Sequence, residues 1–375
     1  MQLGLIGKPN VGKSTFFKAA TLKDVEIANY PFTTIKPNLG ITYVKVKCPH
    51  TELGVDCNPR RGSCIEGTRF VPIELYDVAG LVPGAHQGKG LGNKFLDDIR
   101  RSRVLIMVID ATARTDKQGN EGKGNPIEDV KFVLEEFDRW TAGIIKKSID
   151  TKTKSTINAL EKGLSGLGIN RGHIERALKL IHPSGDCLKF SSELRKISKP
   201  LIIAANKSDS TDGEWFDKLK ELGYPLIPTS AVYEITLRKA SEANLINYIP
   251  GSGNFEIIKD ISEKQREALE RIRKFLKKFG STGVQEVLNK AVFELAKMVP
   301  AFPIEDENKW TDGKNNVLPD CILVEEGTTT KQFAYKIHTD IGDKFVKAID
   351  GRSKMGLGAD HEVEKCAVIK ILTRR

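Results

Sequence analysis

The sequence has no apolar run approaching the roughly 20 residues that a helix needs to cross a bilayer. Only six of its 375 residues are cysteines, which excludes a fold that depends on a dense set of disulfides. It also lacks the biased composition of a disordered chain, since 39% of its residues are hydrophobic and 29% are charged. We therefore expect a globular protein of two or three domains with no membrane anchor.

A glycine-rich segment stands near the start of the chain, directly after an apolar run at residues 3–6 that is typical of a buried strand. It fits the phosphate-binding pattern G-x-x-x-x-G-K-[ST], in which glycines let backbone N–H groups surround a polyphosphate at a helix N-terminus. The predicted nucleotide-binding residues are Gly7, Lys8, Pro9, Asn10, Val11, Gly12, Lys13, Ser14 and Thr15.

Two side chains of this loop have distinct predicted roles. Lys13 would reach the β and γ phosphates as a point charge and is a catalytic candidate, whereas the Ser14 hydroxyl would be a ligand of Mg²⁺. Thr33 and Thr34, in a proline-interrupted segment, are both candidates to complete the Mg²⁺ shell when the γ-phosphate is present. Because the first strand belongs to the phosphate site, we expect no cleavable signal and a cytoplasmic location.

A second nucleotide motif follows the apolar strand predicted over residues 69–76. Asp77 and Gly80 form a D-x-x-G pattern, which places a carboxylate beside Mg²⁺ and a catalytic glycine N–H near the γ-phosphate. Leu81 stands where Ras-like proteins carry the glutamine that orients the attacking water. A leucine cannot orient water, so another group or a partner supplies this function, or intrinsic hydrolysis is slow.

A third motif, N-K-S-D at residues 206–209, follows the apolar strand predicted over residues 200–205. The aspartate of N-K-x-D accepts two hydrogen bonds from guanine that adenine does not offer, so this motif predicts a guanine nucleotide. The asparagine would tie loops together, and the lysine stem would lie over the base. The predicted base-binding residues are Asn206, Lys207, Asp209 and, at the end of the next strand, Ser230 and Ala231, where a backbone N–H would reach the guanine oxygen.

Three of the cysteines crowd with a histidine into one segment, as Cys48, His50, Cys57 and Cys64 in the spacing C-x-H-x(6)-C-x(6)-C. Cysteine and histidine are the usual zinc ligands, and four of them can close a tetrahedral structural site. The spacing is not that of a standard zinc knuckle, so a polar hairpin tip with reduced cysteines remains the alternative.

Apolar periodicity organises the rest of the chain. Residues 104–110 are typical of a strand buried on both faces, and the spacing becomes helical from residue 127. Amphipathic helices are predicted over residues 263–279 and 284–298, and prolines at 300–303 break the pattern. Strands over residues 321–324, 345–349 and 367–372 and a helix over residues 331–338 then indicate a small β-grasp-like unit.

The runs GKPNVGKST, NYPFTTIKPNLG, DVAGLVPGAHQGKGLGNKFL and NKSD, with the terminal segment FPIEDEN…LPDCILVEEGTTTKQFAYKIHTDIGDKFVKAIDGR, resemble the YchF subfamily of Obg-related P-loop GTPases in its archaeal-type form. The resemblance implies an α/β P-loop NTPase G domain, with a mostly parallel sheet and helices on both faces. It also implies an inserted α-helical domain and a C-terminal β-grasp-like TGS domain. The expected boundaries are 1–126 and 197–300 for the G domain, 127–196 for the insertion and 301–375 for the TGS domain.

The resemblance also bears on single residues. It favours Thr34 over Thr33 and makes Leu81 the hydrophobic substitution typical of these enzymes. Asn10 matches the asparagine that helps potassium-activated relatives hold K⁺ beside the phosphates. Bacterial members carry a histidine in the loop that here spans residues 111–126, where this chain has none; His86 is an open substitute.

We therefore expect a Mg²⁺-dependent switch that binds GTP and GDP and hydrolyses GTP. Many YchF members have N-x-x-E and prefer ATP, so an ATP-preferring NTPase is one alternative. A nucleotide-dependent binding module with incidental hydrolysis is another. The resemblance implies the ribosome or RNA as partner in translation or stress response, and a monomer is expected. The net charge of +10 agrees with an acidic partner, although ordinary solvated basic faces explain it equally well.

Overall fold

The structure is a computed structural model that describes residues 1–21, 39–78, 99, 102–116, 119–149 and 156–374. The chain divides into two compact units. The first unit comprises Met1–Leu22, Lys36–Gly40 and Glu74–Ala291, and the second comprises Lys23–Ile35, Ile41–Ile73 and Val292–Arg375. None of the described helices combines the length and the apolar character that a membrane crossing requires.

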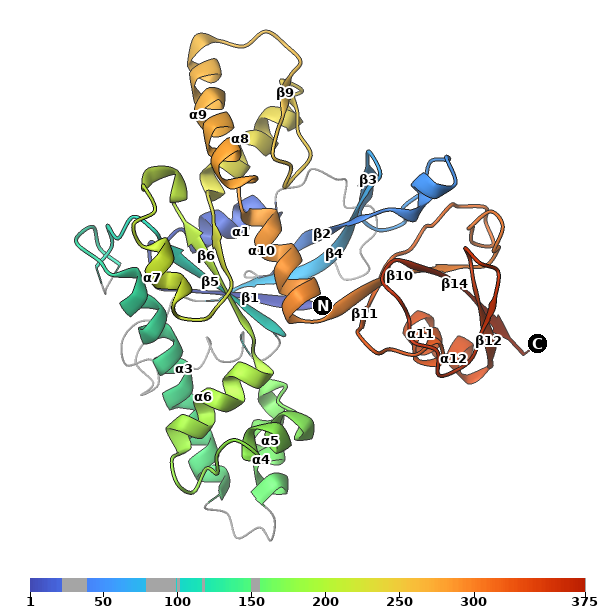
Figure 1. Ribbon diagram of the computed structural model, residues 1–375, viewed down its shortest axis with the longest axis horizontal. Helices are drawn as coiled ribbons and strands as arrows, with labels where there is room; N and C mark the ends of the chain where they lie inside the picture. Colours follow the sequence, from blue (N-terminus) through green and yellow to red (C-terminus); the bar gives the residue numbers. More distant parts are fainter. Residues whose placement is uncertain (22–38, 79–98, 100–101, 117–118, 150–155, 375) are drawn as a thin grey trace. The chain divides into compact units, whose positions relative to one another are not determined.

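The first unit is built on a parallel sheet (Figure 1). The sheet has the order β2-β4-β1-β5-β6-β7, with β2 (Leu39–Lys47) at its edge and β3 (Ser63–Ile65) paired antiparallel to β4, and each pair from β4 to β7 is parallel. All residues of β5 are buried, as predicted for a sheet covered on both faces. Because parallel strands end at the same edge, the segments that follow β1, β4, β5 and β6 meet there. The strands are β1 (Gln2–Ile6), β4 (Thr68–Asp77), β5 (Val104–Asp110), β6 (Leu201–Asn206) and β7 (Leu226–Pro228).

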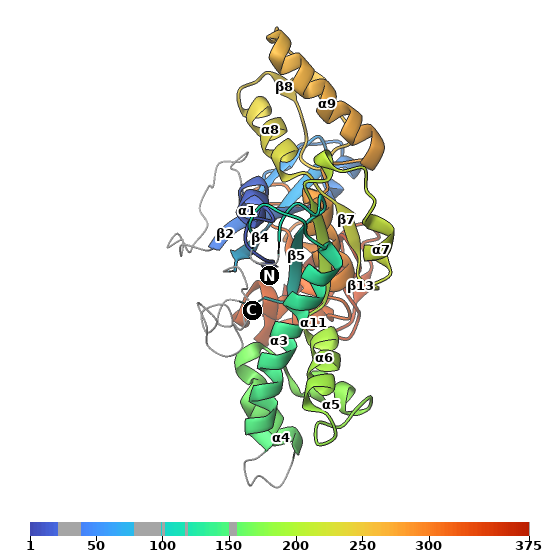
Figure 2. The same cartoon turned by 90° about the vertical axis from the view of Figure 1, so that its left-hand side faces the viewer.

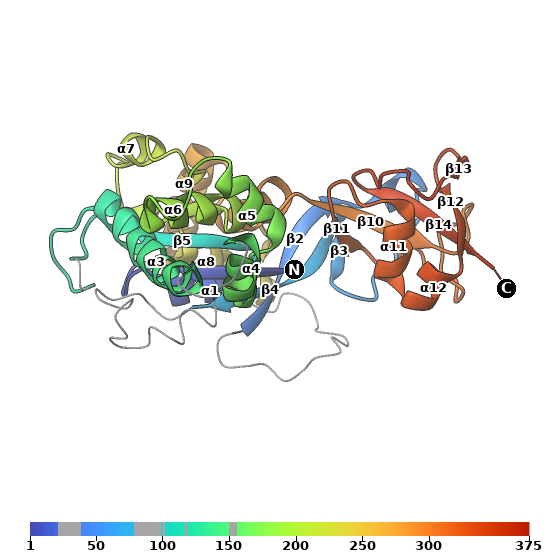
Figure 3. The same cartoon turned by 90° about the horizontal axis from the view of Figure 1, so that it is seen from below.

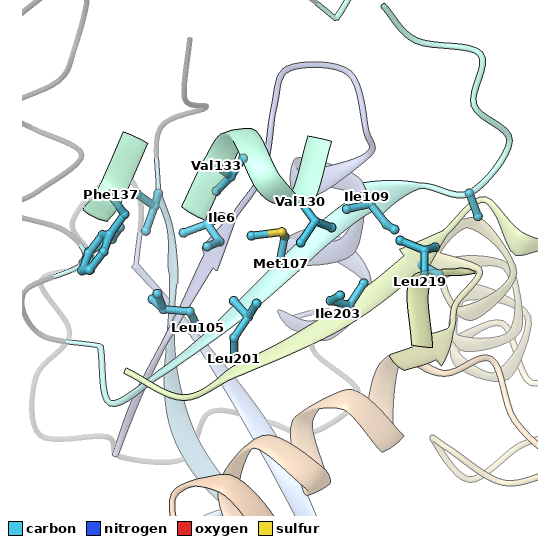
Figure 4. Packing of buried hydrophobic residues seen from close by; sticks show 14 of the residues in the cluster. Ile6, Leu105, Met107, Ile109, Val130, Val133, Phe137, Leu201, Ile203 and Leu219 are labelled. Carbon is cyan, nitrogen blue, oxygen red and sulfur yellow. The ribbon is translucent and has the colours of Figure 1, made fainter. Parts of the chain in front are cut away.

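Helix α3 (Pro126–Ile149) covers one face of this sheet. Figure 4 shows Val130 and Val133 of α3 above Met107 of β5, with Ile203 of β6 beside them. Each such side chain contributes about 1.5 to 3 kcal/mol when it leaves water, so this layer is a main source of stability. The other helices of this unit are α1 (Lys13–Thr21), α7 (Phe216–Lys220), α8 (Ala231–Glu242) and α10 (Val284–Asn289). Helix α9 (Glu263–Phe279) packs with α8 around a separate hydrophobic cluster, beside the short ladder that joins β8 (Ile246–Asn247) to β9 (Glu256–Ile257).

The far part of α3 packs with further helices around a separate hydrophobic cluster (Figure 2). The sequence predicts helices in this part of the chain, but the prediction does not single out α6, although Phe190, Leu194 and Ile197 have helical spacing there. The side chain of Asp186 caps α6 by accepting a hydrogen bond from the Lys189 N–H at 2.9 Å. Arg195 of α6 then forms a buried ion pair with Asp138 of α3 at 2.7 Å. The helices are α4 (Thr156–Leu164), α5 (Arg171–Leu178) and α6 (Cys187–Ser198).

The C-terminal part of the second unit is a mixed sheet with two helices beside it (Figure 3). Its strand order is β11-β10-β14-β12-β13, in which β10 is antiparallel to β11 and parallel to β14. Phe333 of α11 is fully buried in the core of this sheet. The elements are β10 (Met298–Ile304), β11 (Ile322–Glu325), α11 (Thr330–Ile337), α12 (Thr339–Asp343), β12 (Phe345–Asp350), β13 (Gly356–Leu357) and β14 (Ala367–Thr373).

The prediction for residues 284–303 is partly wrong. Helix α10 ends at Asn289, a π-helix covers Lys290–Leu295, and both prolines lie inside β10. A proline in a central strand is rare because it offers no N–H. Pro300 still pairs through its carbonyl, which accepts a hydrogen bond from the Cys366 N–H at 2.7 Å. Pairing with two neighbouring strands therefore overrides the local preference of proline.

The segment Ile41–Ile73 belongs to the second unit, a grouping that the sequence did not suggest. It contains most of β2 (Leu39–Lys47), the short helix η1 (Pro49–Glu52), β3 (Ser63–Ile65) and the start of β4. We call residues 41–73 the hairpin segment. Its Asn58 N–H donates to the Val317 carbonyl at 2.9 Å, and its Arg60 N–H donates to the Pro319 carbonyl at 2.8 Å. The predicted domain boundaries stay a prediction.

Candidate nucleotide site

The loop between β1 and α1 has glycines where other residues would not fit. Gly12 has φ +91°, and a Cβ there would lie 2.2 Å from Nδ2 of Asn206. Gly7 has φ +150°, and a Cβ there would lie 2.5 Å from the carbonyl oxygen of Val108. Both positions need glycine because a side chain would clash and the backbone angle disfavours one. Among the other predicted loop residues, Val11 is fully buried, while Pro9 and Thr15 are half-buried.

Lys13, Ser14 and Asp77 come together at the carboxyl edge of the sheet. Nζ of Lys13 lies 2.9 Å from Oδ1 of Asp77, and the Ser14 hydroxyl donates to Oδ2 of Asp77 at 3.3 Å. The Lys13 side chain is 12% exposed and that of Asp77 20%, so both charges are partly shielded from water. A hydroxyl and a carboxylate side by side are oxygen donors that suit Mg²⁺.

Asn206, at the end of β6, connects two loops. Its Nδ2 donates to the Val11 carbonyl at 3.0 Å, and its Oδ1 accepts from the Ala231 N–H at 3.1 Å. The Ser230 N–H donates to the Thr282 carbonyl at 2.9 Å. The N–H groups predicted to reach the guanine oxygen therefore have partners within the protein, and binding through them would require an exchange of hydrogen bonds.

Lys207 has φ +62°, in the left-handed region. Its Nζ donates to the Asn10 carbonyl at 3.0 Å and pairs with Oδ2 of Asp110 at 2.8 Å. Burial alone would raise the pKa of Asp110. Hydrogen bonds from Lys207 and Thr112 outweigh that effect, so the pKa lies below its usual value. The ionised carboxylate of Asp110 therefore holds the ammonium group of Lys207 in place. This role was not predicted from the sequence.

Lys8 has a buried side chain, 1% exposed, that points away from solvent. Its Nζ forms an ion pair with Asp129 of α3 at 2.7 Å and donates to the carbonyls of Thr115 and Asp116, each at 2.8 Å. Burial raises the pKa of Asp129, and the Lys8 ammonium opposes that shift. The Lys8 side chain therefore holds the loop after β5 against the phosphate-binding loop, and only its backbone is available to a phosphate.

Asn10 and Asp209 lie nearer the surface. Asn10 has φ +63°, and its Nδ2 donates to the Gly119 carbonyl at 2.8 Å. Asp209 is half-buried, and its Oδ2 accepts from the Ser210 hydroxyl at 2.9 Å. Neither side chain is buried in the core: Asn10 is held by the loop after β5, and Asp209 by its neighbour in sequence. The candidates Thr33, Thr34, Gly80, Leu81 and His86 lie outside the described residues, so their roles stay predictions.

Cys48, His50, Cys57 and Cys64 form a separate cluster in the hairpin segment of the second unit. Their ligand atoms all lie within 4.8 Å of one another. Hydrogen bonds from the Cys48 and Cys64 thiols lower the pKa of Cys57. The structure thus brings together all four residues that the sequence singled out.

The parallel sheet, the phosphate-binding loop and the residues after β6 define a P-loop protein of the GTPase class. Family models match three parts of the chain: "50S ribosome-binding GTPase" at residues 2–137, "Obg-like GTPase YGR210-like, G4 motif-containing domain" at residues 204–306, and "TGS domain" at residues 314–373. The chain belongs to the YchF family of Obg-like GTP-binding proteins, as the sequence predicts. The expected fold class is confirmed as well.

Relatives match nearly the whole chain. A protein of Methanocaldococcus jannaschii named as an uncharacterized GTP-binding protein is 48% identical, over 99% of this chain and 98% of its own length. A ribosome-binding ATPase YchF from Buchnera aphidicola is 28% identical, over 92% and 86%. The crystal structure of a GTP-binding protein from Pyrococcus horikoshii OT3 covers 100% of both chains, with 37% identity and a TM-score of 0.79. A YchF GTPase structure from Schizosaccharomyces pombe shares the fold, with 19% identity and a TM-score of 0.61, over 99% of this chain and 97% of its own.

Proposed function

We propose that the protein is a Mg²⁺-dependent switch that binds and hydrolyses GTP. The observation that carries the proposal is the meeting of Lys13, Ser14 and Asp77 at the sheet edge where Asn206 also fastens the phosphate-binding loop. These residues would supply the phosphate, metal and base contacts from one unit of the protein. Membership of a family of GTP-binding proteins gives independent support.

Three side chains would have separate roles in binding the triphosphate. Ser14 and Asp77 would hold Mg²⁺, which neutralises phosphate charge when bound. Lys13 is paired with Asp77 at 2.9 Å and would exchange this carboxylate for phosphate oxygens. The pair therefore keeps the Lys13 ammonium near the loop before nucleotide enters, which lowers the cost of ordering it on binding.

Guanine selection is the finer part of the proposal and depends on Asp209. The test is to titrate GTP and ATP side by side, with Mg²⁺ and K⁺ present, into the native protein and into Asp209→Ala. We expect a GTP preference of at least about a hundredfold that the variant loses, because a carboxylate left unpaired by adenine penalises ATP. Asp212→Ala is the matched control, since Asp212 is an exposed acid of the same loop.

Equal or tighter ATP binding by the native protein would contradict the proposal. It would favour an ATPase instead, in line with relatives named ribosome-binding ATPase at 27–28% identity. A single-turnover rate measured with and without ribosomes separates a switch from a docking module in which hydrolysis is incidental. For a switch, we expect the rate to rise when the partner is present.

The ribosome is the proposed partner, and it would place the protein in the cytosol. The support is the net charge of +10 and the names of the relatives. We expect nucleotide-dependent sedimentation with ribosomes that weakens as salt is raised, because contacts with phosphates release counterions. No co-sedimentation in any nucleotide state would contradict a ribosomal partner without affecting nucleotide binding.

A further inference from the structure

The hairpin segment carries a cluster of metal-ligating side chains that takes no part in the nucleotide site. Cys48 precedes η1 and is fully buried, and His50 lies within η1. Cys57 follows in the loop, and Cys64 lies on β3, each half-buried like His50. Different local elements thus converge on one point, with no ligand atom more than 4.8 Å from another.

Two separations between ligand atoms match those around a tetrahedral zinc ion. Sγ of Cys48 lies 3.8 Å from Sγ of Cys57, and Sγ of Cys64 lies 3.6 Å from Nδ1 of His50. Zinc with bonds of about 2.3 Å to sulfur and about 2.0 to 2.1 Å to nitrogen separates two sulfurs by about 3.8 Å and a sulfur from a nitrogen by about 3.5 to 3.6 Å. The two cysteines are too far apart to be disulfide-bonded, since that bond is about 2.0 Å long.

A buried cation beside the cluster is an independent sign of negative charge there. Arg69 is 0% exposed, and its guanidinium donates to the carbonyls of Leu318 at 3.0 Å and Pro319 at 2.8 Å. Its remaining polar partner among the described residues is Sγ of Cys57 at 3.8 Å. Burying a charge costs several kcal/mol of folding free energy unless an opposite charge compensates it. Zinc with thiolates of all three cysteines and a neutral imidazole carries a single net negative charge, which would balance Arg69.

The backbone of the hairpin segment holds these groups in place. Cys64 on β3 stands directly opposite Arg69 on β4. The turn between the strands consists of Glu66 and Gly67, with φ +47° and +76°, as a tight two-residue hairpin requires. The Gly67 carbonyl accepts a hydrogen bond from the Cys48 N–H at 2.8 Å, which ties the first ligand to this turn. The ligands are therefore prearranged by the fold.

We propose that Cys48, His50, Cys57 and Cys64 bind one structural zinc ion, and that Arg69 connects this site to residues 318–319 of the same unit. Four protein ligands fill the tetrahedral shell and leave no position for substrate, so the role is structural. The zinc site would hold the tip of the hairpin segment against the C-terminal part of the second unit. This inference goes beyond the proposed function and does not depend on it.

The test measures metal in the full-length protein, expressed in zinc-supplemented medium and purified without chelators. Elemental analysis should find about one zinc per chain. Cys57→Ser and Cys64→Ser should each lower the content at least about fivefold, because each removes a ligand. Cys187→Ser, a half-buried cysteine of the first unit, should leave it unchanged. Cobalt exchanged into the native protein should give the absorption of a tetrahedral ion with thiolate charge transfer.

A second measurement needs no variant and covers the case in which the serine proteins do not fold. Titrating the thiols of the native protein with a mercurial should release about one zinc as they react. Trypsin should then cut after Arg60 or Arg61, both exposed on the hairpin segment, at least about tenfold faster than in the loaded protein. Native protein without zinc, a disulfide between cluster cysteines, or an iron–sulfur spectrum would each overturn the proposal. Metal content is read without nucleotide, so this outcome is independent of GTP binding.

Discussion

The proposed nucleotide site of the first unit and the cysteine–histidine cluster of the second are built in different ways. In the nucleotide site each motif is contiguous in sequence, and the parallel sheet brings the ends of β1, β4 and β6 to one edge. The cluster has an unusual ligand spacing, and Arg69 beside it bonds to carbonyls about 250 positions away along the chain. The nucleotide motifs and the four ligand candidates of the cluster can all be read from sequence, whereas the buried Arg69 beside the cluster is recognisable only once the fold has placed it.

The two sites also compensate buried charge differently. Lys8 in the first unit pairs with the carboxylate of Asp129. Arg69 in the second unit faces two carbonyls and a sulfur. A carboxylate balances a cation by itself, whereas a sulfur does so only as a thiolate. We therefore expect the folding stability of the second unit, but not that of the first, to depend on bound metal and on Arg69.

The largest expected effect is on Arg69. Arg69→Met should lower the free energy of unfolding of the second unit by about 3 to 5 kcal/mol, because it leaves buried partners without their cation. Arg60→Ala removes exposed ion pairs with Asp312 and Asp320 and should cost less than about 1 kcal/mol. Urea unfolding followed by the fluorescence of Trp310, the tryptophan of this unit, measures both.

The fluorescence experiment needs Trp140 and Trp215, which belong to the first unit, replaced by phenylalanine. If both arginine variants lose the same free energy of unfolding, the buried Arg69 contributes no more to stability than the exposed Arg60. The contrast between the two units would then have to be abandoned.

The next largest effect should be on Lys13 in the first unit. Lys13→Ala should reduce the single-turnover rate of GTP hydrolysis by about 10²- to 10³-fold, the usual result of removing one group that stabilises the transition state. Lys18→Ala, on the exposed face of the same helix, should leave the rate unchanged. The zinc content should be the same in both variants, and a loss of zinc in Lys13→Ala would contradict the independence of the two sites.

A smaller effect sharpens the comparison of buried cations. Lys199 is 3% exposed, and its Nζ donates to the carbonyls of Ser102 at 2.5 Å and Ile99 at 3.4 Å. Burial lowers the pKa of Lys199 from 10.5 to about 8. Above pH 8 the folded protein therefore releases this proton while the unfolded chain still binds it, so folding stability rises with pH up to about 10.5.

Relative to Lys199→Met, the native protein should gain about 2 kcal/mol of unfolding free energy between pH 8 and pH 10. Urea unfolding at a series of pH values measures this difference. Parallel profiles for the two proteins would mean that Lys199 stays protonated in the folded state.

The smallest effect concerns the cation beside the phosphates. If Asn10 helps to hold K⁺ there, replacing K⁺ with Na⁺ should lower GTP turnover at least about threefold, because a misplaced cation stabilises the transition state less well. GTP affinity measured in both salts is the control, and it should change little. Equal turnover in the two salts would rule out the potassium hypothesis.

Local signals account for what the sequence predicted well. Helix α9 spans Glu263–Phe279, the predicted range, because Ser262 and Gln265 form a capping box at its start and Gly280 ends it with φ +83°. The nucleotide motifs were found for the same reason. Helix α6 was overlooked although Asp186 gives it a local N-cap. Features set by distant partners were missed for a different reason, among them the ion pair of Lys8 with Asp129 and the prolines inside β10. No local pattern encodes these contacts.

The hydrogen bond from Asn206 to Val11 has a consequence for how the chain is synthesised. The two residues are 195 positions apart, so a ribosome makes the phosphate-binding loop long before it makes the residue that fastens that loop. A nascent chain that stops before β6 contains the glycine-rich loop but lacks Asn206, whose hydrogen bond holds that loop in place. Tight nucleotide binding should therefore begin only after β6 has left the exit tunnel, which leaves the earlier nascent chain to fold without bound GTP.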